Sequence, residues 1–322
     1  GASTSSVDLG AYNFNDIKSI DLNSEHNVIF SATRKTKTQT FRGAYGTKNG
    51  KAPYYTLREE LVDGVPLEGL SSVVSISENG YTAFSTVLNG AGGIYRGDIG
   101  TTSVLIPGSG TFYNNNPPLA VNNSGEIALS MEYFDPTMGL TKGIPVFSTQ
   151  NQTTATLYTA IEKAGIGANS RSVDINNFGQ VAFSINGSVT MKFYDPPDNA
   201  SGTLIKTITL EPGVYIAKQT PFGQPKSVKK VAGQSGPYER FGRVRINDSG
   251  RVVFEATTDA GKYGIYWGPD AVTNKIIEVG DTYNGELFSW VRLGGLNNNG
   301  QMTMITSDFY STDRQIWRVD GL

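Results

Sequence analysis

The chain has 322 residues and no cysteine, which excludes disulfides and thiolate metal sites. Its formal net charge is −2, from 27 basic and 29 acidic residues, which excludes a general nucleic-acid binder. With 38 glycines and only 17 % charged residues the composition is typical of an all-β protein, and no apolar run reaches the roughly 18 residues of a membrane span.

The N-terminal segment carries the first predicted strand. The leading GASTSS is typical of a mature end after signal cleavage, or equally of an expression scar. Residues 5–9 (SSVDL) resemble residues 277–281 (IEVGD), which precede the last hairpin of the chain. We therefore expect residues 5–9 to complete the last sheet and leave no sheet edge open.

A short phrase then recurs six times: apolar–Asn–polar–x–Gly–x–apolar–small–aromatic. Alternating apolar residues before the Asn predict a half-buried strand, and the next four residues predict a tight turn. Asn can bond its own backbone there, and Gly tolerates positive φ, so each phrase is a β-hairpin. The six turns fall at residues 23–26, 77–80, 122–125, 176–179, 247–250 and 297–300. The structural turn residues are Asn23, Gly80, Asn122, Gly125, Asn176, Gly179, Asn247, Gly250, Asn297 and Gly300.

Further strands follow most hairpins. Third strands are predicted at residues 93–96, 143–147, 191–194, 264–267 and 315–318, and fourth strands at 103–106, 155–158, 204–209 and 275–279. Four antiparallel strands about every 54 residues is the content of one propeller blade. The sequence thus predicts a single domain over residues 1–322, a six-bladed β-propeller of four-stranded antiparallel blades whose last blade is closed by the N-terminal strand. An open stack of the same units is the alternative. The recurring Phe30, Phe84, Phe183 and Phe254 are expected to fill the core.

The phrase N-x-x-G-x-x-A-F resembles the signature of a tandem-repeat family found mostly in exported bacterial proteins. Asn176, Gly179, Ala182 and Phe183 match it in full. The other copies depart from it by substitution, as at Ser77, and the first retains only Asn23 and Phe30. The resemblance spans nearly the whole chain and implies secretion or display at the cell surface. It supplies no catalytic residue.

Two stretches between hairpins look like insertions, at residues 33–55 and 195–231, and insertions carry function on a repeat scaffold. The first is basic and aromatic without an acid, which suits an anionic polysaccharide because cations attract anions and aromatic rings stack on sugars. A solvated edge strand guarded by lysines is the other interpretation. The candidate ligand-binding residues are Arg34, Lys35, Lys37, Phe41, Arg42, Tyr45, Tyr54 and Tyr55.

Several chemistries find little support. His26 is the only histidine, so a multi-histidine zinc site is excluded, and it stands in a turn position that holds Gly elsewhere. No metal or other cofactor is expected. Calcium at the Asp- and Asn-rich turns (Asp21, Asn23, Asp174, Asn176) stays an alternative, although no loop has a known calcium spacing. The chain lacks the S-x-D-x-G-x-x-W hairpins of sialidase-type propellers.

Three functions remain open at this point. The sequence favours a non-enzymatic, secreted or cell-surface protein that binds a glycan or another surface component. A carbohydrate-active hydrolase or lyase, using carboxylates, Tyr and Arg at the channel mouth, is the second. A structural or adhesive module of a surface layer is the third, and its partner would be a surface protein.

Overall fold

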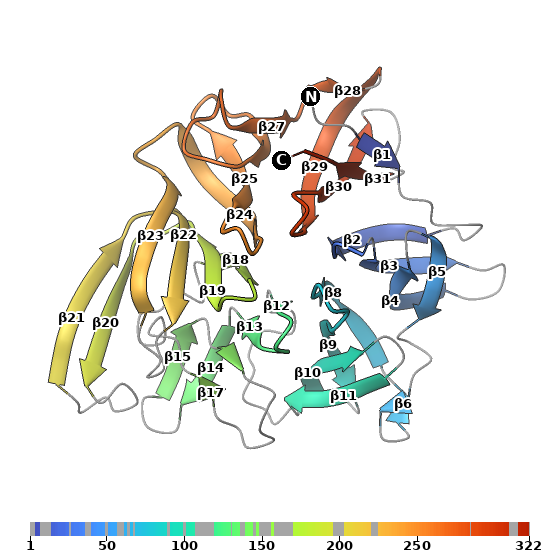
Figure 1. Cartoon of the computed structure of the whole chain (residues 1–322), viewed down its shortest axis with the longest axis horizontal. Helices are drawn as coiled ribbons and strands as arrows, with labels where there is room; N and C mark the ends of the chain where they lie inside the picture. The colour runs from blue at the N-terminus through green and yellow to red at the C-terminus, as the bar shows by residue number, and fades with distance from the viewer. Residues whose placement is uncertain are drawn as a thin grey trace. The chain divides into compact units, whose positions relative to one another are not determined.

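A computed structural model gives the fold of the chain (Figure 1). It describes residues 4–6, 14–25, 27–35, 40–48, 51–56, 61–62, 65–66, 68–88, 91–98, 101–106, 119–129, 131–135, 139–143, 146–147, 156–157, 170–195, 203–219, 225–283, 285–308 and 315–321. All elements over these residues are β-strands, and every strand pairing is antiparallel where its register is defined. None of the described elements is a helix that could cross a membrane. The all-β prediction is confirmed.

The described residues form six sheets of four or five strands, which we number as repeats 1 to 6 after their Asn-rich turns. Repeat 1 contains β2 (Phe14–Leu22), β3 (Val28–Lys35), β4 (Thr40–Lys48) and β5 (Lys51–Thr56). Repeat 2 contains β8 (Glu68–Ile76), β9 (Thr82–Leu88), β10 (Ala91–Asp98) and β11 (Thr101–Ile106). Repeat 3 contains β12 (Leu119–Val121), β13 (Ile127–Leu129), β16 (Val146–Phe147) and β17 (Thr156–Leu157).

The later repeats follow the same order. Repeat 4 contains β18 (Ser170–Ile175), β19 (Gln180–Ile185), β22 (Gly213–Gln219) and β23 (Pro225–Gly233). Repeat 5 contains β24 (Tyr238–Ile246), β25 (Val252–Thr258), β26 (Tyr263–Tyr266) and β27 (Lys275–Glu278). Repeat 6 contains β28 (Thr282–Tyr283), β29 (Glu286–Leu296), β30 (Met302–Asp308) and β31 (Gln315–Val319). In each repeat the Asn-rich turn joins the two strands of the recurring hairpin.

The N-terminal strand β1 (Thr4–Ser6) belongs to the sheet of repeat 6, although it lies at the opposite end of the sequence. Ser5 stands opposite Arg318 and Ser6 opposite Trp317 in the β1–β31 ladder. The ladder therefore covers residues 4–6 of the chain, whereas the sequence predicted a strand over 5–9, of which residues 7–9 lie outside the described part.

Three two-stranded sheets accompany the repeats, and one of them corrects the strand assignment made from sequence. They are β6 (Leu61–Val62) with β7 (Val65–Pro66), β14 (Met131–Asp135) with β15 (Gly139–Gly143), and β20 (Val189–Asp195) with β21 (Thr203–Leu210). Residues 191–194 and 204–209 were predicted as the third and fourth strands of repeat 4, which is wrong. They pair only with each other, and β22 and β23 take those places. Alternation of apolar residues identifies a strand but does not choose its partner.

The apparent insertion at residues 33–55 is also reassigned. Its described backbone forms β3, β4 and β5, three of the four strands of repeat 1. The extra length between the turns of repeats 4 and 5 includes the β20–β21 hairpin, which accounts for only the first part of residues 195–231. Outer strands of a sheet need no continuous apolar pattern, so a basic and aromatic sequence can still be regular β-structure.

The chain divides into two compact units. Unit 1 comprises Gly1–Gly110, Val121–Asn123 and Ile277–Leu322, and unit 2 comprises Thr111–Ala120 and Ser124–Ile276. Repeats 1, 2 and 6 thus fall in unit 1, and repeat 4 and most of repeat 5 in unit 2.

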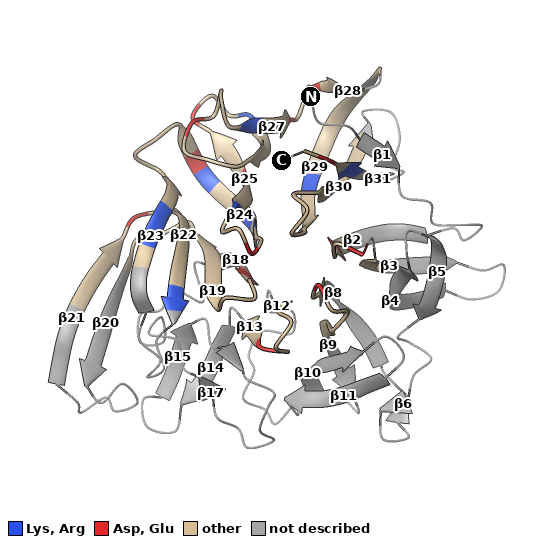
Figure 2. Cartoon of the chain, in the orientation of Figure 1, with Lys and Arg blue, Asp and Glu red and all other residues tan. Residues whose placement is uncertain are grey.

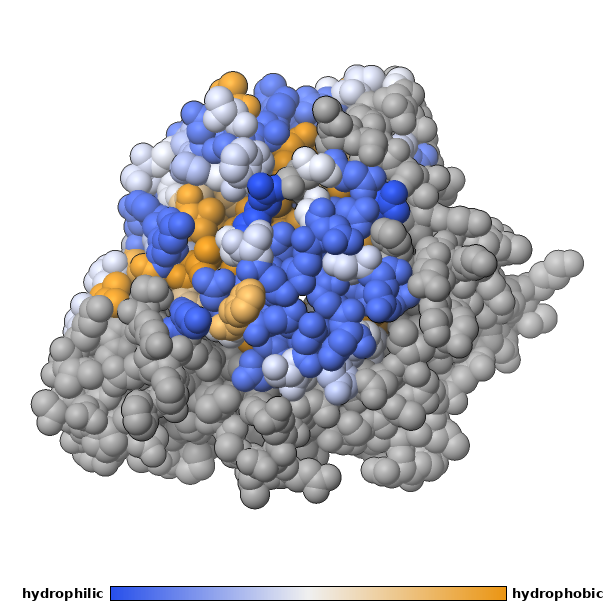
Figure 3. All heavy atoms as spheres, in the orientation of Figure 1, coloured by the Kyte–Doolittle hydropathy of each residue, from blue (hydrophilic) through white to orange (hydrophobic). Residues whose placement is uncertain are grey.

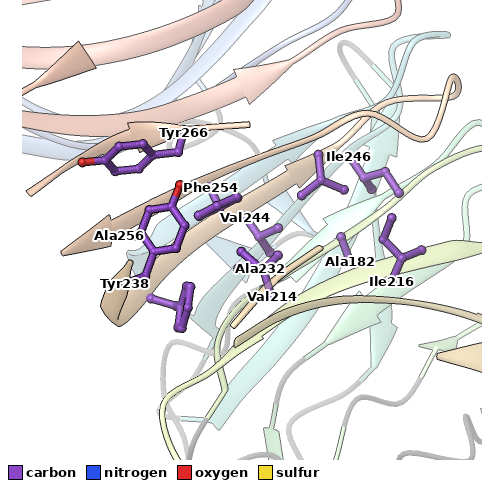
Figure 4. Packing of buried hydrophobic residues seen from close by; sticks show 12 residues of the cluster. Ala182, Val214, Ile216, Ala232, Tyr238, Val244, Ile246, Phe254, Ala256 and Tyr266 are labelled. Carbon is purple, nitrogen blue, oxygen red and sulfur yellow. The ribbon is translucent and has the colours of Figure 1, made fainter. Parts of the chain in front are cut away.

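Within each unit the sheets pack face to face on apolar side chains. In unit 2, Phe254 and Val244 of repeat 5 pack on Ala182, Val214 and other residues of repeat 4 (Figure 4). In unit 1, Phe30 and Ile20 of repeat 1 pack against Ile305 and Ile316 of repeat 6.

The recurring phenylalanines are buried, and Phe30 and Phe254 lie in these two interfaces. The prediction that Phe30, Phe84, Phe183 and Phe254 fill the core is confirmed, because each is fully buried. Burial of such a side chain stabilises the fold by roughly 1.5–3 kcal/mol. A single sheet cannot bury this face alone, so each repeat depends on the next one.

Candidate functional site: the interlocked Asn-rich turns

The Asn-rich turns share one local geometry. The glycines at the fourth position, Gly80, Gly125, Gly179, Gly250 and Gly300, have φ between 67° and 92°. In repeat 4 the backbone N–H of Gly179 donates to the carbonyl of Asn176 at 3.1 Å, and Asn176 N–H donates to Gln180 O at 3.0 Å. Positive φ is unstrained only for glycine, which is why the fourth position is so regular.

The Asn at the first position closes its own turn. Asn176 Oδ1 accepts the backbone N–H of Gln180 at 3.0 Å, and Asn297 Oδ1 accepts that of Gln301 at 2.9 Å. Asn23 and Asn247 make the same bond at 3.0 and 3.1 Å. These side chains are all buried, so the hydrogen bond replaces one that water would otherwise supply.

The amide nitrogen of the same Asn reaches the neighbouring repeat. Asn23 Nδ2 donates to the carbonyl of Ser77 at 3.3 Å, from repeat 1 to repeat 2. Asn176 Nδ2 donates to the carbonyl of Asn247 at 3.1 Å, from repeat 4 to repeat 5. We call this bond between equivalent turn positions the Asn latch. It requires an amide, because only Asn combines the acceptor for its own turn with a donor for the next.

The last repeat forms the same latch with the first. Asn297 Nδ2 donates to the carbonyl of Asn23 at 3.2 Å, although 274 residues separate them. Asn299 Nδ2 donates to Ser24 O at 3.3 Å beside it. Within unit 1, the junction between repeats 6 and 1 is therefore made by the same bond as the junction between repeats 1 and 2.

A second layer of bonds joins the residues that follow the latch. Asp248 accepts both the backbone N–H and the side-chain amide of Asn177, at 2.8 and 2.7 Å. In unit 1, Glu78 accepts the N–H of Ser24 at 2.5 Å through one oxygen and that of Asn298 at 2.8 Å through the other. The longer Glu side chain thus connects repeat 2 to repeats 1 and 6 together.

Repeat 2 departs from the pattern because Ser77 replaces Asn. Ser77 Oγ still accepts the N–H of Tyr81 at 3.0 Å, which closes the turn. The contact to repeat 3 passes instead to Asn79, which donates from Nδ2 to Asn123 O at 3.0 Å and from its backbone to Asn123 Oδ1 at 2.9 Å. A hydroxyl can close the turn but offers a single proton, so another side chain makes the junction.

Carboxylates on the strands before the turns strengthen two of the junctions. Asp21 Oδ2 accepts Ser75 Oγ–H and the backbone N–H of Ile76, both at 2.9 Å. In unit 2, Asp174 Oδ2 accepts the backbone N–H of Ile246 at 2.8 Å. All these groups are buried, where a hydrogen bond to a charged acceptor contributes about 1.5–3 kcal/mol.

The aspartates once considered for calcium are therefore engaged in joining repeats. No group of three His, Asp or Glu side chains suited to a metal occurs among the described residues.

A separate polar cluster lies beside the β22–β23 hairpin. Glu211 accepts Lys230 Nζ at 2.7 Å and Ser235 Oγ at 3.0 Å, and these bonds hold the pKa of the Glu211 carboxyl below its ordinary value. Tyr215 OH donates to the Glu211 carbonyl at 2.7 Å. Burial raises the pKa of Tyr215 to about 12, and the Glu211 charge adds to the effect. The cluster thus connects Glu211 to Tyr215 of β22 and Lys230 of β23.

Exposed aromatic side chains form the other notable surface feature. Phe178 is 62 % exposed at the tip of the repeat 4 turn, and Trp267 is 44 % exposed at the end of β26. The guanidinium carbon of Arg251 lies 5.9 Å from the centre of the Trp267 ring. Sequence reasoning treated residues 264–267 as a strand and missed this pair. The one available signal was a tryptophan directly after the buried Tyr266.

The ligand-binding residues predicted from sequence lie in strands or beyond the described part. Arg34 and Lys35 are in β3, Phe41, Arg42 and Tyr45 in β4, and Tyr54 and Tyr55 in β5. Their side chains lie outside the described residues, as do Lys37 and His26 altogether. In the pairing of β3 with β4, Arg34 stands opposite Phe41.

The sequence was compared with known families and curated proteins. A family model, described as a family of unknown function (DUF7453), matches residues 22–307. The chain belongs to DUF7453. This match does not confirm the resemblance to the N-x-x-G-x-x-A-F family, and no curated protein sequence matches the chain. The Asn-rich turns that carry the latch, from residues 23–26 to residues 297–300, all lie within the DUF7453 match.

Solved structures similar to this DUF7453 chain are β-propeller-like proteins. Prolyl oligopeptidase B from Galerina marginata aligns with a TM-score of 0.53 and 10 % identity, over 96 % of this chain and 49 % of its own. The Hadza microbial sialidase Hz136 aligns with a TM-score of 0.48 and 8 % identity, over 96 % of this chain and 66 % of its own. TolB from Acinetobacter baumannii aligns with a TM-score of 0.45 and 12 % identity, over 95 % and 63 %. This chain spans between half and two thirds of those proteins. The similarity to the first concerns the fold alone.

Proposed function

We propose that the chain is an exported, six-bladed β-propeller that binds a glycan at the cell surface and has no catalytic role. The proposal of six blades is supported by the latch from repeat 6 to repeat 1, which repeats the one from repeat 1 to repeat 2. Pairing of β1 with β31 supports it further, because the first strand then completes the last sheet. The export rests on the resemblance to the N-x-x-G-x-x-A-F repeats.

The observation that carries the binding role is the amide-rich surface that the locked turns present in unit 1. Asn79, Asn298 and Asn299 are exposed, and each has at least one hydrogen bond to another turn. Where the residues around these turns are described, their surface is largely hydrophilic (Figure 3). Amides donate and accept hydrogen bonds without net charge, as sugar hydroxyls require. Because the turns fix them, little conformational entropy is lost on binding.

The predicted partner is a polysaccharide, and the basic and aromatic strands β3 to β5 favour an anionic one. No resident metal is part of this proposal, since the aspartates near the turns bond to backbone N–H groups. If no glycan binds, the same surface would instead bind a surface protein, and the chain would be an adhesive module.

A glycan array that includes neutral and acidic polysaccharides tests the proposal with the full chain. We expect binding to at least one polysaccharide class, weakened in Asn79→Ala with Asn299→Ala, or in the triple variant of Lys35, Arg42 and Tyr45 to Ala. Absence of binding to every glycan would overturn it. Turnover of a bound polysaccharide, abolished by one Asp, Glu or Tyr substitution, would replace it with the hydrolase or lyase alternative.

A further inference from the structure

Arg251 and Trp267 form an exposed pair in unit 2, on two adjacent strands of repeat 5. Arg251 directly precedes β25, and Trp267 directly follows β26, which pairs with β25 through Phe254 and Tyr266. The guanidinium lies 5.9 Å from the indole centre, within the range of a cation–π interaction. Both side chains are exposed, so the pair is open to a ligand.

The pair has unused hydrogen-bonding capacity. In the part of the chain that the structure describes, the Arg251 guanidinium has no ion pair and no hydrogen bond, and neither has the indole N–H of Trp267. Two other exposed cations differ: Arg240 lies 3.5 Å from Glu239, and Lys230 lies 2.7 Å from Glu211. Described Lys and Arg residues are otherwise scattered over strands such as β22, β23 and β27 (Figure 2). Arg251 thus offers five N–H donors in a planar fork that matches a carboxylate.

Hydrogen bonds hold the backbone around Trp267 in place. Its backbone N–H donates to Asn274 O at 3.1 Å, and the buried Tyr238 donates its OH to Gly268 O at 2.9 Å. In the same loop, Asp270 Oδ1 accepts the N–H groups of Val272 and Thr273, both at 2.8 Å. These two bonds hold the pKa of Asp270 below its ordinary value, so the carboxylate keeps the loop ordered near neutral pH. The indole therefore needs little ordering before it binds a ligand.

We propose that Arg251 and Trp267 bind one carboxylated sugar residue of a glycan, a uronic acid or a similar acidic saccharide. The carboxylate pairs with the Arg251 guanidinium, and the apolar face of the sugar ring lies against the exposed indole. The choice of a sugar over an acidic peptide follows from the chemistry of the pair, because a single cation beside a flat aromatic surface recognises a ring that carries one charge. The inference rests on the proposed function and adds a ligand class and a second surface.

Titration calorimetry with the full chain tests it, using two probes that differ only in charge. One is a tetrasaccharide of uronic acids, and the other is the same tetrasaccharide with its carboxyl groups reduced to alcohols. We expect wild type to bind the acidic probe about tenfold more tightly than the reduced one. Arg251→Ala and Trp267→Ala should each weaken the acidic probe about tenfold, and Arg251→Ala should abolish the difference between probes.

Matched control variants distinguish binding at a specific site from a general effect of surface charge. Arg240→Ala removes another exposed cation, and Phe178→Ala removes another exposed aromatic ring, and both variants should bind the acidic probe as wild type does. Thermal melting checks that every variant is folded. Binding of the acidic probe that is unchanged in Arg251→Ala and Trp267→Ala would overturn the inference while the proposed function stands.

Two further outcomes also count against it. Equal binding of a polyglutamate peptide, lost in the same variants, would show an unspecific anion surface. Binding to no glycan on the array and to neither probe would remove the proposed function together with this inference.

Discussion

The junctions of unit 1 and unit 2 use the same Asn latch but distribute the supporting charge differently. In unit 2, Asp248 of repeat 5 accepts two hydrogen bonds from Asn177 of repeat 4. In unit 1, Glu78 of repeat 2 serves Ser24 of repeat 1 and Asn298 of repeat 6. Ser24 occupies the position of Glu78 and Asp248, and its hydroxyl is buried without a partner among the described residues.

The difference shows how the latch tolerates an incomplete repeat. The short Ser24 side chain leaves repeat 1 without an acceptor for the N–H that repeat 6 presents, and Glu78 reaches from one repeat further to supply it. Three repeats in unit 1 therefore depend on one carboxylate, whereas the bonds from Asn177 to Asp248 in unit 2 join two repeats.

The largest loss of stability is expected from a substitution at Gly295 in unit 1, where there is no room for a side chain. An added Cβ at Gly295 of repeat 6 would lie 2.5 Å from the backbone nitrogen of Leu22 and clash with Asp21. Because the clash is with backbone, Gly295→Ala should lower the free energy of unfolding by about 3 kcal/mol. Urea unfolding measures it.

Gly261→Ala is the control for that substitution. Gly261 has φ of 76° and nothing within 4 Å of an added Cβ, so only backbone strain of about 1–2 kcal/mol applies. Equal losses at positions 295 and 261 would contradict the close approach of repeats 6 and 1.

The next largest effect concerns the latch itself. Asn297→Asp and Asn176→Asp keep the oxygen that closes the turn but replace the donor with a carboxylate facing a carbonyl. Both positions are buried, so each change should cost about 2–3 kcal/mol, and the two losses should be similar. Thermal and urea unfolding of the two variants provides the measurement.

The exposed Asn299 gives a matched comparison. Asn299→Asp makes the same chemical change at a weaker bond of 3.3 Å, and about 0.5 kcal/mol is expected. If Asn297→Asp were no worse than Asn299→Asp, the bond from repeat 6 to repeat 1 would not stabilise the fold.

A smaller effect separates the two carboxylates that were compared above. Glu78→Ala and Asp248→Ala should each cost about 1 kcal/mol, because water can replace part of the lost bonding at these half-buried turns. Hydrogen exchange followed by mass spectrometry distinguishes them. Glu78→Ala should speed exchange in the turns of both repeat 1 and repeat 6, and Asp248→Ala only in repeat 4. Faster exchange in a single turn of the Glu78 variant would refute the shared junction.

An effect of similar size, about 1 kcal/mol, is a pH dependence confined to unit 2. The pKa of Tyr215 is raised from 10.0 to about 12, so its contribution is complete below pH 10 and is lost as pH rises towards 12. At pH 8, Tyr215→Phe should lose about 1 kcal/mol with the bond to Glu211 O. That difference between the two proteins should shrink above pH 10 in urea unfolding. A difference that stays constant from pH 8 to 12 would contradict the raised pKa.

Much of the local architecture follows from spacing in the sequence. Gly at the fourth position of five of the six turns and alternating apolar residues on both sides are enough to place the hairpins, since positive φ and strand alternation are local requirements. The burial of Phe183 and Phe254 follows from the same register. The strand partners of residues 191–194 and 204–209 could not be predicted in this way. Both segments alternate well enough to join either the four-stranded sheet of repeat 4 or a separate two-stranded sheet.

The candidate sites were less accessible to sequence reasoning. Asn297 was expected only to close its turn, and no local pattern reveals that its amide reaches Asn23, 274 residues away. Arg251 and Trp267 likewise are 16 positions apart and meet only because β25 and β26 are adjacent. The basic and aromatic run around Arg42 was conspicuous in sequence, yet its backbone is ordinary strand.

The sequence by itself determined the hairpins, because turn chemistry and side-chain alternation act within about ten residues and need no partner. Only the tertiary structure decided which hairpin pairs with which strand, which amide reaches which carbonyl, and which aromatic ring remains in water. Those outcomes depend on stacking sheets whose apolar faces must be covered. Covering them brings together residues that no spacing along the chain could connect.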